Sequence, residues 1–99
     1  MNTKTAGATV GENLRRVRIR AGESQAECAA RVAGHGLAWS RDNVAALEGG
    51  RRAEVNVSEL FILSAAYGLP VSDWFAGDGD VQLTATTRAS RSDMREVLQ

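Results

Sequence analysis

Three consecutive side chains near the middle of the chain, Arg41, Asp42 and Asn43, carry groups that can recognise the edges of nucleic-acid bases. Arginine forms paired hydrogen bonds with guanine, a carboxylate accepts from the cytosine amino group, and asparagine pairs with adenine. Ser40 stands directly before them and is expected to cap a helix that they begin. The alternative is a solvated first helical turn, in which the helix dipole alone favours Asp42.

A second group of side chains has the chemistry of contacts to a phosphate backbone. Arg51 and Arg52 directly follow the helix that Ser40 would cap, and both can bind phosphate oxygens. Ser24 and Gln25 stand at the start of another predicted helix, whose unpaired amides and positive dipole end attract phosphate. The alternatives are a plain charged surface for the two arginines and an ordinary first-turn position for Gln25.

The helix between these two groups is predicted to have an almost bare outer face. Ala45 and Ala46 are small, so the helix axis could approach the bases closely. Val44 and Leu47 would form the buried stripe of the helix, and Trp39 is placed to pack on Val44 as a hydrophobic staple. The outer face of this helix, which holds Ala45 and Ala46, is therefore a candidate interface with DNA rather than a catalytic site.

The sequence motifs do not favour an enzyme. A phosphate-binding loop, a zinc-protease helix, a nucleophile elbow and a dinucleotide fingerprint are all missing from the sequence. One cysteine, Cys28, and one histidine, His35, cannot form a four-ligand zinc site of these residue types. Cys28 is expected to be a small core residue and His35 an exposed loop residue, and no catalytic residue, cofactor or metal is expected.

Composition predicts one globular domain, since 43% of the 99 residues are hydrophobic and 24% are charged. The net charge is zero, yet residues 1–52 carry a charge of +4 and residues 53–99 a charge of −4. This asymmetry predicts one half that faces a polyanion and another half that faces a different partner. No apolar run is long enough for a membrane span or a signal peptide, so a cytoplasmic, nucleoid-associated protein is expected.

Arginine outnumbers lysine by eleven to one. This preference suits bidentate contacts to phosphate and to guanine, because the guanidinium group is a planar fork of donors. It would equally result from a GC-rich genome, so composition alone does not decide between the two explanations.

Hydrophobic periodicity and helix-capping residues predict five short helices, followed by a strand and a last helix. Residues 1–9 show no periodicity and are expected to form a flexible arm. Residues 10–77 are expected to fold as one helical domain, in which the first helix covers residues 10–21. The later helices are each preceded by a capping residue, namely Ser24, Ser40, Asn56 and Ser72.

Residues 78–99 are expected to form a strand-plus-helix extension. Apolar residues alternate with polar ones in a half-buried strand, and others then mark one side of a helix that Ser92 would cap. These apolar residues are Val81, Leu83 and Ala85 in the strand and Met94, Val97 and Leu98 in the helix. A lone strand has an open edge and the helix face needs burial, so this extension is the candidate surface for dimerisation.

The order of these motifs over residues 11–75 resembles the lambda repressor/Cro-like helix-turn-helix domain, also called the xenobiotic-response-element family. The matching segments are residues 14–18, 24–29, 40–51, 57–60 and 67–72. The turn at residues 33–39 is longer than the usual tight turn of the family, and Cys28 replaces a leucine. The resemblance implies an all-α fold, a five-helix lambda repressor-like DNA-binding domain over residues 10–77 with a short C-terminal extension.

By the same resemblance, the chain is expected to be a sequence-specific double-stranded DNA-binding transcriptional regulator. It would act as a repressor that occupies its operator as a homodimer, without a cofactor. Arg18 matches the family arginine that pairs with a glutamate at the end of the recognition helix, here Glu48. This ion pair would orient the helix that begins after Ser40.

A function of another class also fits the charge distribution. The chain could be an antitoxin or a protein-binding adaptor that holds a protein partner through its acidic C-terminal half. The two hypotheses differ in the partner that they require, which is duplex DNA for the first and a protein for the second.

Overall fold

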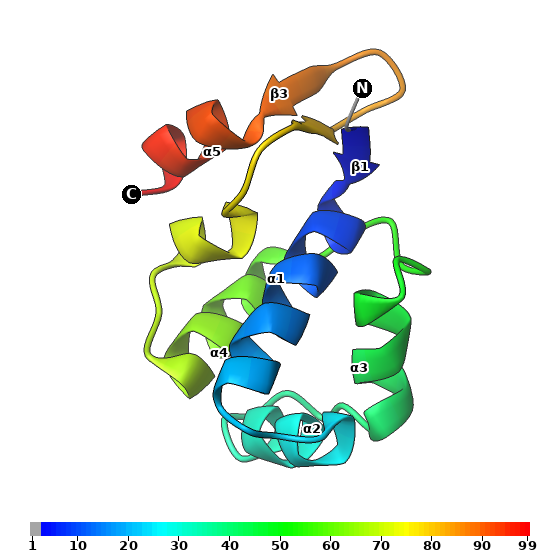
Figure 1. Cartoon of the computed structure of the whole chain (residues 1–99), viewed down its shortest axis with the longest axis vertical. Coiled ribbons are helices and arrows are strands. Elements are labelled where there is room, and N and C mark those ends of the chain that lie inside the picture. The colour runs from blue at the N-terminus through cyan, green and yellow to red at the C-terminus, as the bar shows by residue number, and fades with distance from the viewer. Residues whose placement is uncertain (1–2) are drawn as a thin grey trace.

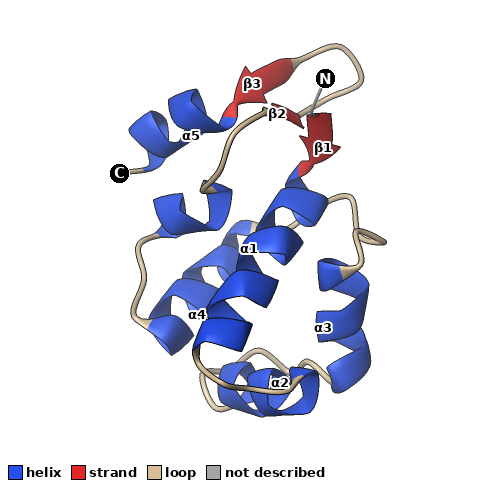
Figure 2. Ribbon diagram, viewed as in Figure 1, coloured by secondary structure: helices blue, strands red, loops and turns tan. Residues whose placement is uncertain are grey.

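Helices make up most of residues 3–99, the part of the chain that the computed structural model describes (Figure 1, Figure 2). In chain order the elements are β1 (Thr3–Thr5), α1 (Ala6–Arg20), α2 (Gln25–Ala33), α3 (Arg41–Glu48), α4 (Val57–Tyr67), the 3-10 helix η1 (Val71–Phe75), β2 (Asp80–Gln82), β3 (Arg88–Ser90) and α5 (Arg91–Leu98). The elements from α1 to η1 agree with the five helices predicted. A three-stranded sheet takes the place of the single predicted strand, so the domain is mostly helical but not all-α.

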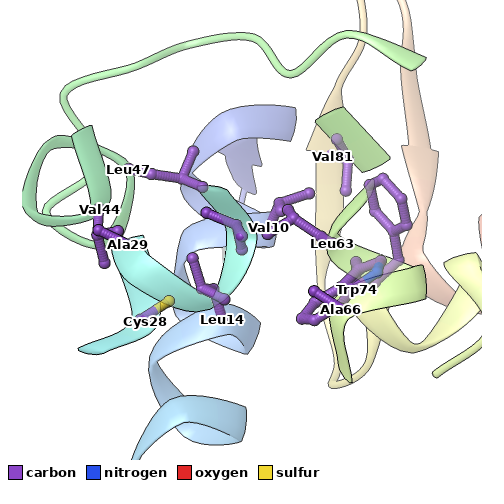
Figure 3. Packing of buried hydrophobic residues seen from close by; sticks show 12 residues of the cluster. Val10, Leu14, Cys28, Ala29, Val44, Leu47, Leu63, Ala66, Trp74 and Val81 are labelled. Carbon is purple, nitrogen blue, oxygen red and sulfur yellow. The ribbon is translucent and has the colours of Figure 1, made fainter. Parts of the chain in front are cut away.

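The hydrophobic core lies between the helices and reaches the sheet at Val81 (Figure 3). Its buried apolar residues are Val10, Leu14, Cys28, Ala29, Val32, Val44, Leu47, Leu63, Ala66, Trp74, Phe75 and Val81. Many of them recur at helical spacing, which is why periodicity locates the helices in the sequence. Cys28 is fully buried, and this burial raises the pKa of its thiol, as expected for a core residue.

Local capping interactions start α2 and α4 at the residues that the sequence predicts. In α2, the Glu27 amide donates to the Ser24 hydroxyl at 3.1 Å, and the Glu27 carboxylate accepts from the Ser24 amide at 2.8 Å. In α4, Asn56 and Glu59 exchange the same two bonds at 2.7 and 2.9 Å. These reciprocal pairs are capping boxes, which provide hydrogen-bond acceptors for backbone amides that are otherwise unpaired at the start of a helix. Gly68 ends α4 in the left-handed conformation, with φ of 65°.

The flexible arm expected over residues 1–9 is wrong for the described part of this segment, and Met1 and Asn2 lie outside the described residues. β1 pairs with β2, and α1 follows β1 directly. Thr5 caps α1, because its hydroxyl accepts from the Ala8 amide at 3.0 Å. The first turn of α1 consists of glycine and alanine, so apolar periodicity could not reveal it.

Two glycines allow α1 to lie directly against the end of α3. A Cβ atom at Gly7 would overlap the carbonyl oxygen of Arg52, and one at Gly11 would overlap the carbonyl oxygen of Leu47. The Gly7 amide donates to the Ala53 carbonyl at 2.9 Å. Since any side chain at these two positions would push the backbones apart, the close crossing of α1 and α3 depends on them.

The C-terminal segment packs against the N-terminal segment rather than standing apart from it. β2 pairs in parallel with β1 and antiparallel with β3, so the sheet joins both ends of the chain (Figure 2). Val81 is fully buried. The strand expected to reach Ala85 ends at Gln82, because the Leu83 amide turns back to donate to the Thr87 carbonyl at 2.9 Å.

Two helix starts differ from the prediction. Ser72 does not cap η1, because it lies inside that helix, which has no side-chain cap. α5 begins two residues earlier than expected. Its capping residue is Ser90 and not Ser92, because the Ser90 hydroxyl accepts from the Asp93 amide at 3.0 Å. The early start places Arg91 in the first turn of α5, where it is 2% exposed.

Arg91 connects α5 to the helical core through an ion pair. Its Nη1 donates to Glu12 of α1 and to the Ala76 carbonyl, both at 2.8 Å, and the Lys4 ammonium of β1 pairs with the same carboxylate. The Arg91 hydrogen bond is the main reason that the pKa of Glu12 falls to about 2, although burial opposes this shift. One carboxylate of α1 thus binds both β1, which directly precedes α1, and α5 at the other end of the chain.

Acidification should weaken the fold through Glu12. Its pKa in the folded chain is about 2, below the ordinary 4.5, so its stabilisation is complete above pH 4.5 and is lost as the pH falls towards 2. The free energy of unfolding, measured with urea, should be higher for the wild type than for Glu12→Gln at pH 4.5. This difference should shrink as the pH falls towards 2. Glu96→Gln removes an exposed carboxylate outside this network and should follow the wild type. A gap that does not change with pH would contradict this account.

Candidate nucleic-acid interface

α3 presents its first turn to solvent. Arg41, Asp42 and Asn43 are all exposed, and 64% of the Arg41 side chain and 91% of the Asp42 side chain are accessible. The Arg41 guanidinium lies 3.6 Å from the Asp42 carboxylate. A surface contact of this kind contributes less than about 1 kcal/mol, so both groups can turn to another partner at little cost.

Asn43 has a structural partner that the sequence interpretation missed. Its Oδ1 accepts from the Ser40 amide at 2.8 Å and from the Ser40 hydroxyl at 3.1 Å. Asparagine thus takes the place of the glutamate or glutamine of a capping box, and the spacing of Ser40 and Asn43 was the available signal. Paired hydrogen bonds to adenine would use the same oxygen, so they would compete with the helix cap.

The ion pair implied for Arg18 and Glu48 is present in the structure. Arg18 Nε lies 2.7 Å from Glu48 Oε2 and Nη2 lies 2.9 Å from Oε1, while Nη1 donates to the Glu23 carbonyl at 2.8 Å. The side chains of Arg18 and Glu48 are only 12% and 4% exposed. The bond to Glu48 is the main cause that raises the pKa of Arg18, so the guanidinium keeps its charge. It fixes the end of α3 to α1.

The start of α2 joins the same cluster. Gln25, which the sequence assigns to phosphate binding, donates from Nε2 to Glu48 Oε1 at 3.2 Å. The capping box uses the amides of Ser24 and Glu27, and within residues 3–99 the amides of Gln25 and Ala26 have no acceptor. An anion at this helix start would therefore meet two unpaired backbone donors.

Arg51 and Arg52 are adjacent in sequence but differ in their surroundings. Arg52 forms a two-bond ion pair with Glu59, at 2.9 and 2.8 Å, and its guanidinium lies 5.7 Å from the centre of the Trp39 ring. Burial would raise the pKa of Glu59, but the hydrogen bonds from Arg52 and from the Asn56 amide outweigh burial and lower it. Arg51 is exposed and forms no ion pair within residues 3–99. Of the two arginines, Arg51 is the one available to an outside ligand.

A hollow of about 340 Å³ brings several of the predicted residues together where α1, α2 and α3 meet. Its lining residues are Arg15, Arg18, Gln25, Ala45, Glu48, Gly49 and Arg51. Gln25, Ala45 and Arg51 were predicted for the interface, whereas Arg15 was not, because its position on the outer face of α1 is typical of any solvated arginine. Ala46 is half-buried, and its carbonyl accepts from the Arg51 amide at 3.0 Å.

Among residues 3–99, no group of three or more His, Cys, Asp or Glu side chains is arranged to hold a metal ion. No helix in this range has the length and apolar character needed to cross a membrane. Comparisons with protein-family models, with curated proteins and with solved structures find no match to this chain.

Removing Glu48 should be costly, because Arg18 would keep its charge in a largely buried place without a partner. Glu48→Ala is expected to lower the free energy of unfolding by about 3 kcal/mol, measured by urea denaturation at neutral pH. Asp42→Ala on the same helix breaks only an exposed contact and should cost less than about 1 kcal/mol. Equal losses for the two variants would refute a structural role for the pair.

Proposed function

We propose that this chain is a sequence-specific double-stranded DNA-binding protein that regulates transcription as a repressor. The observation that carries the proposal is how α3 is held. Its last residue, Glu48, is bonded to Arg18 of α1 and Gln25 of α2, while Arg41 and Asp42 of its first turn are exposed to solvent. A rigidly held helix with an accessible polar first turn is what base recognition in the major groove requires.

Each remaining group has a defined task in this proposal. Arg41 would donate to a guanine edge, and Asp42 would accept from cytosine or simply stabilise the helix start. The unpaired amides of Gln25 and Ala26 and the guanidinium of Arg51 would bind backbone phosphates. Repression would follow from occupancy of the operator, because a bound protein competes with the polymerase for the same DNA.

A second copy of the chain is part of the proposal. One helix reads only a few base pairs, and useful specificity normally requires two half-sites about 34 Å apart. The candidate contact surface is the C-terminal groove, a hollow of about 270 Å³ lined by Leu83, Ala89, Asp93, Met94, Val97 and Leu98. Val97 is 82% exposed, and β3 beside it is an open edge of the sheet. β3 and α5, which carry most of its lining residues, lie at the end of the molecule opposite α2 (Figure 1).

An antitoxin or adaptor is the second candidate function, and the same C-terminal groove favours it. An exposed apolar groove with an open strand edge beside it suits a protein partner of either kind. The two functions then predict different behaviour. A repressor would pair with a second copy of itself and bind duplex DNA without another protein, whereas an antitoxin or adaptor would use the groove for a different protein.

Arg41 should contribute to sequence discrimination rather than to general affinity for DNA. Against a duplex selected from a random pool, Arg41→Ala should lose about 1–3 kcal/mol of binding free energy in fluorescence anisotropy at fixed salt. Against a scrambled duplex the loss should be much smaller. Arg88→Ala, at an exposed site on β3, should bind both duplexes like the wild type. Failure of the wild type to enrich any duplex would refute the proposed function.

Val97 should be needed for self-association. Sedimentation experiments should show a dimer for the wild type and a monomer for Val97→Asp, because the change puts a charge into the apolar groove. Phe61→Asp makes the same kind of change on α4, where Phe61 is 70% exposed, and should leave the dimer intact. These substitutions are preferable to deletion of residues 81–99, which would remove the buried Val81 and Arg91. A monomeric wild type would favour the antitoxin or adaptor.

A further inference from the structure

We infer that Arg15 of α1 completes a binding seat for a phosphate diester of the nucleic-acid backbone, together with Arg51 and the start of α2. The seat is the hollow of about 340 Å³ at the meeting point of α1, α2 and α3. The inference rests on the proposed function and adds α1 to the DNA interface, which the helix-turn-helix resemblance places on α2 and α3.

The charges around the hollow favour an anion. Glu48 is the one carboxylate among its lining residues, and it is 4% exposed and bound by Arg18 and Gln25. The pair of Arg18 and Glu48 is therefore neutral as a unit. Arg15 and Arg51 are exposed, and no carboxylate of residues 3–99 pairs with either. Two uncompensated guanidinium groups thus line the same concavity, and both have the planar donor geometry that matches phosphate oxygens.

The backbone around Gly49 lets Arg51 lie close to the hollow. Arg51 Nη1 is 3.3 Å from the point where a Cβ atom of residue 49 would stand. Gly49 has an ordinary helical conformation, with φ of −80°, so the glycine provides space here rather than a special backbone angle.

A neighbouring hollow gives room for the chain of phosphates to continue. It has a volume of about 450 Å³ and shares Arg15, Glu48 and Gly49 with the first hollow. Its other charged groups, Lys4 and Glu12, form an ion pair with each other, and Arg91 binds the same carboxylate, so this network adds no free negative charge to the hollow. Arg15 lines both hollows and no carboxylate of residues 3–99 pairs with it, so it is placed to bind a phosphate of the backbone in either.

Arg16 provides a matched control for Arg15. It is the next residue of α1 and is equally an exposed arginine, but it lines neither hollow. If Arg15 were only a solvated surface charge, its removal would affect DNA binding no more than the removal of Arg16. Circular dichroism melting should show that Arg15→Gln and Arg16→Gln fold like the wild type, because both side chains are exposed.

The first test measures the salt dependence of binding to a selected duplex and to a scrambled duplex by fluorescence anisotropy. Loss of one phosphate contact should reduce the slope of log affinity against log salt by about 0.9. Arg15→Gln should show this reduction equally on both duplexes, because a phosphate contact does not read sequence, and Arg16→Gln should change the slope by less than half as much. An Arg15→Gln slope equal to that of Arg16→Gln, with normal binding by the wild type, would overturn the inference and leave the proposed function intact.

The second test uses inorganic phosphate alone and does not depend on DNA recognition. The arginine Nε–Hε resonances of the whole chain are followed by NMR while phosphate replaces chloride at constant ionic strength. Arg15 and Arg51 should shift together and Arg16 should not, and the Arg51 shift should weaken in Arg15→Gln. If they shift while no duplex binds, the seat exists but the proposed function fails. If neither shifts more than Arg16, the inference is wrong.

Discussion

Glu48 has almost no access to water, and the position of α3 depends on how its charge is compensated. Arg18 binds both of its carboxylate oxygens, and Gln25 adds a third donor. These bonds bring α1, α2 and the end of α3 to one point, since Arg18 lies on α1, Gln25 on α2 and Glu48 at the end of α3. It also neutralises an acid that would otherwise repel a polyanion from this surface. The ion pair of Arg18 with Glu48 therefore both fixes the position of α3 and removes a negative charge from the candidate interface.

The contact between α1 and α3 adds a steric constraint to this electrostatic one. Gly7 and Gly11 have no side chains, so α1 can lie against the backbone of the end of α3 and of the segment that follows it. The N-terminal half of α1, which holds both glycines, is fixed in turn by the sheet and by Glu12, which binds Lys4 and Arg91. Residues 78–99 thus stabilise the helix that positions α3, although they lie at the opposite end of the molecule from α2 (Figure 1).

Features that depend on neighbours in sequence could be predicted, and features that depend on distant partners could not. The caps at Ser24 and Asn56 and the apolar stripes of the helices are local, so the sequence displays them directly. The start of α1 and the sheet could not be predicted, because short strands of three residues become stable only when paired. For the same reason the sequence could not distinguish Arg52, which Glu59 binds, from the adjacent and unpaired Arg51.

The long turn before α3 is stabilised by this same Arg52. The turn covers residues 34–40 and contains Trp39, whose ring lies 5.7 Å from the Arg52 guanidinium, while Glu59 of α4 holds Arg52 in place. α3 has eight residues, too few for a helix to be stable alone in water. The ion pair of Arg52 with Glu59 thus orders, through Trp39, the turn that leads into α3. The ion pair of Arg18 with Glu48 holds the last residue of α3. A short helix held at both ends in this way keeps one orientation although Arg41 and Asp42 of its first turn are exposed to solvent. The longer turn before α3 therefore does not by itself loosen that orientation.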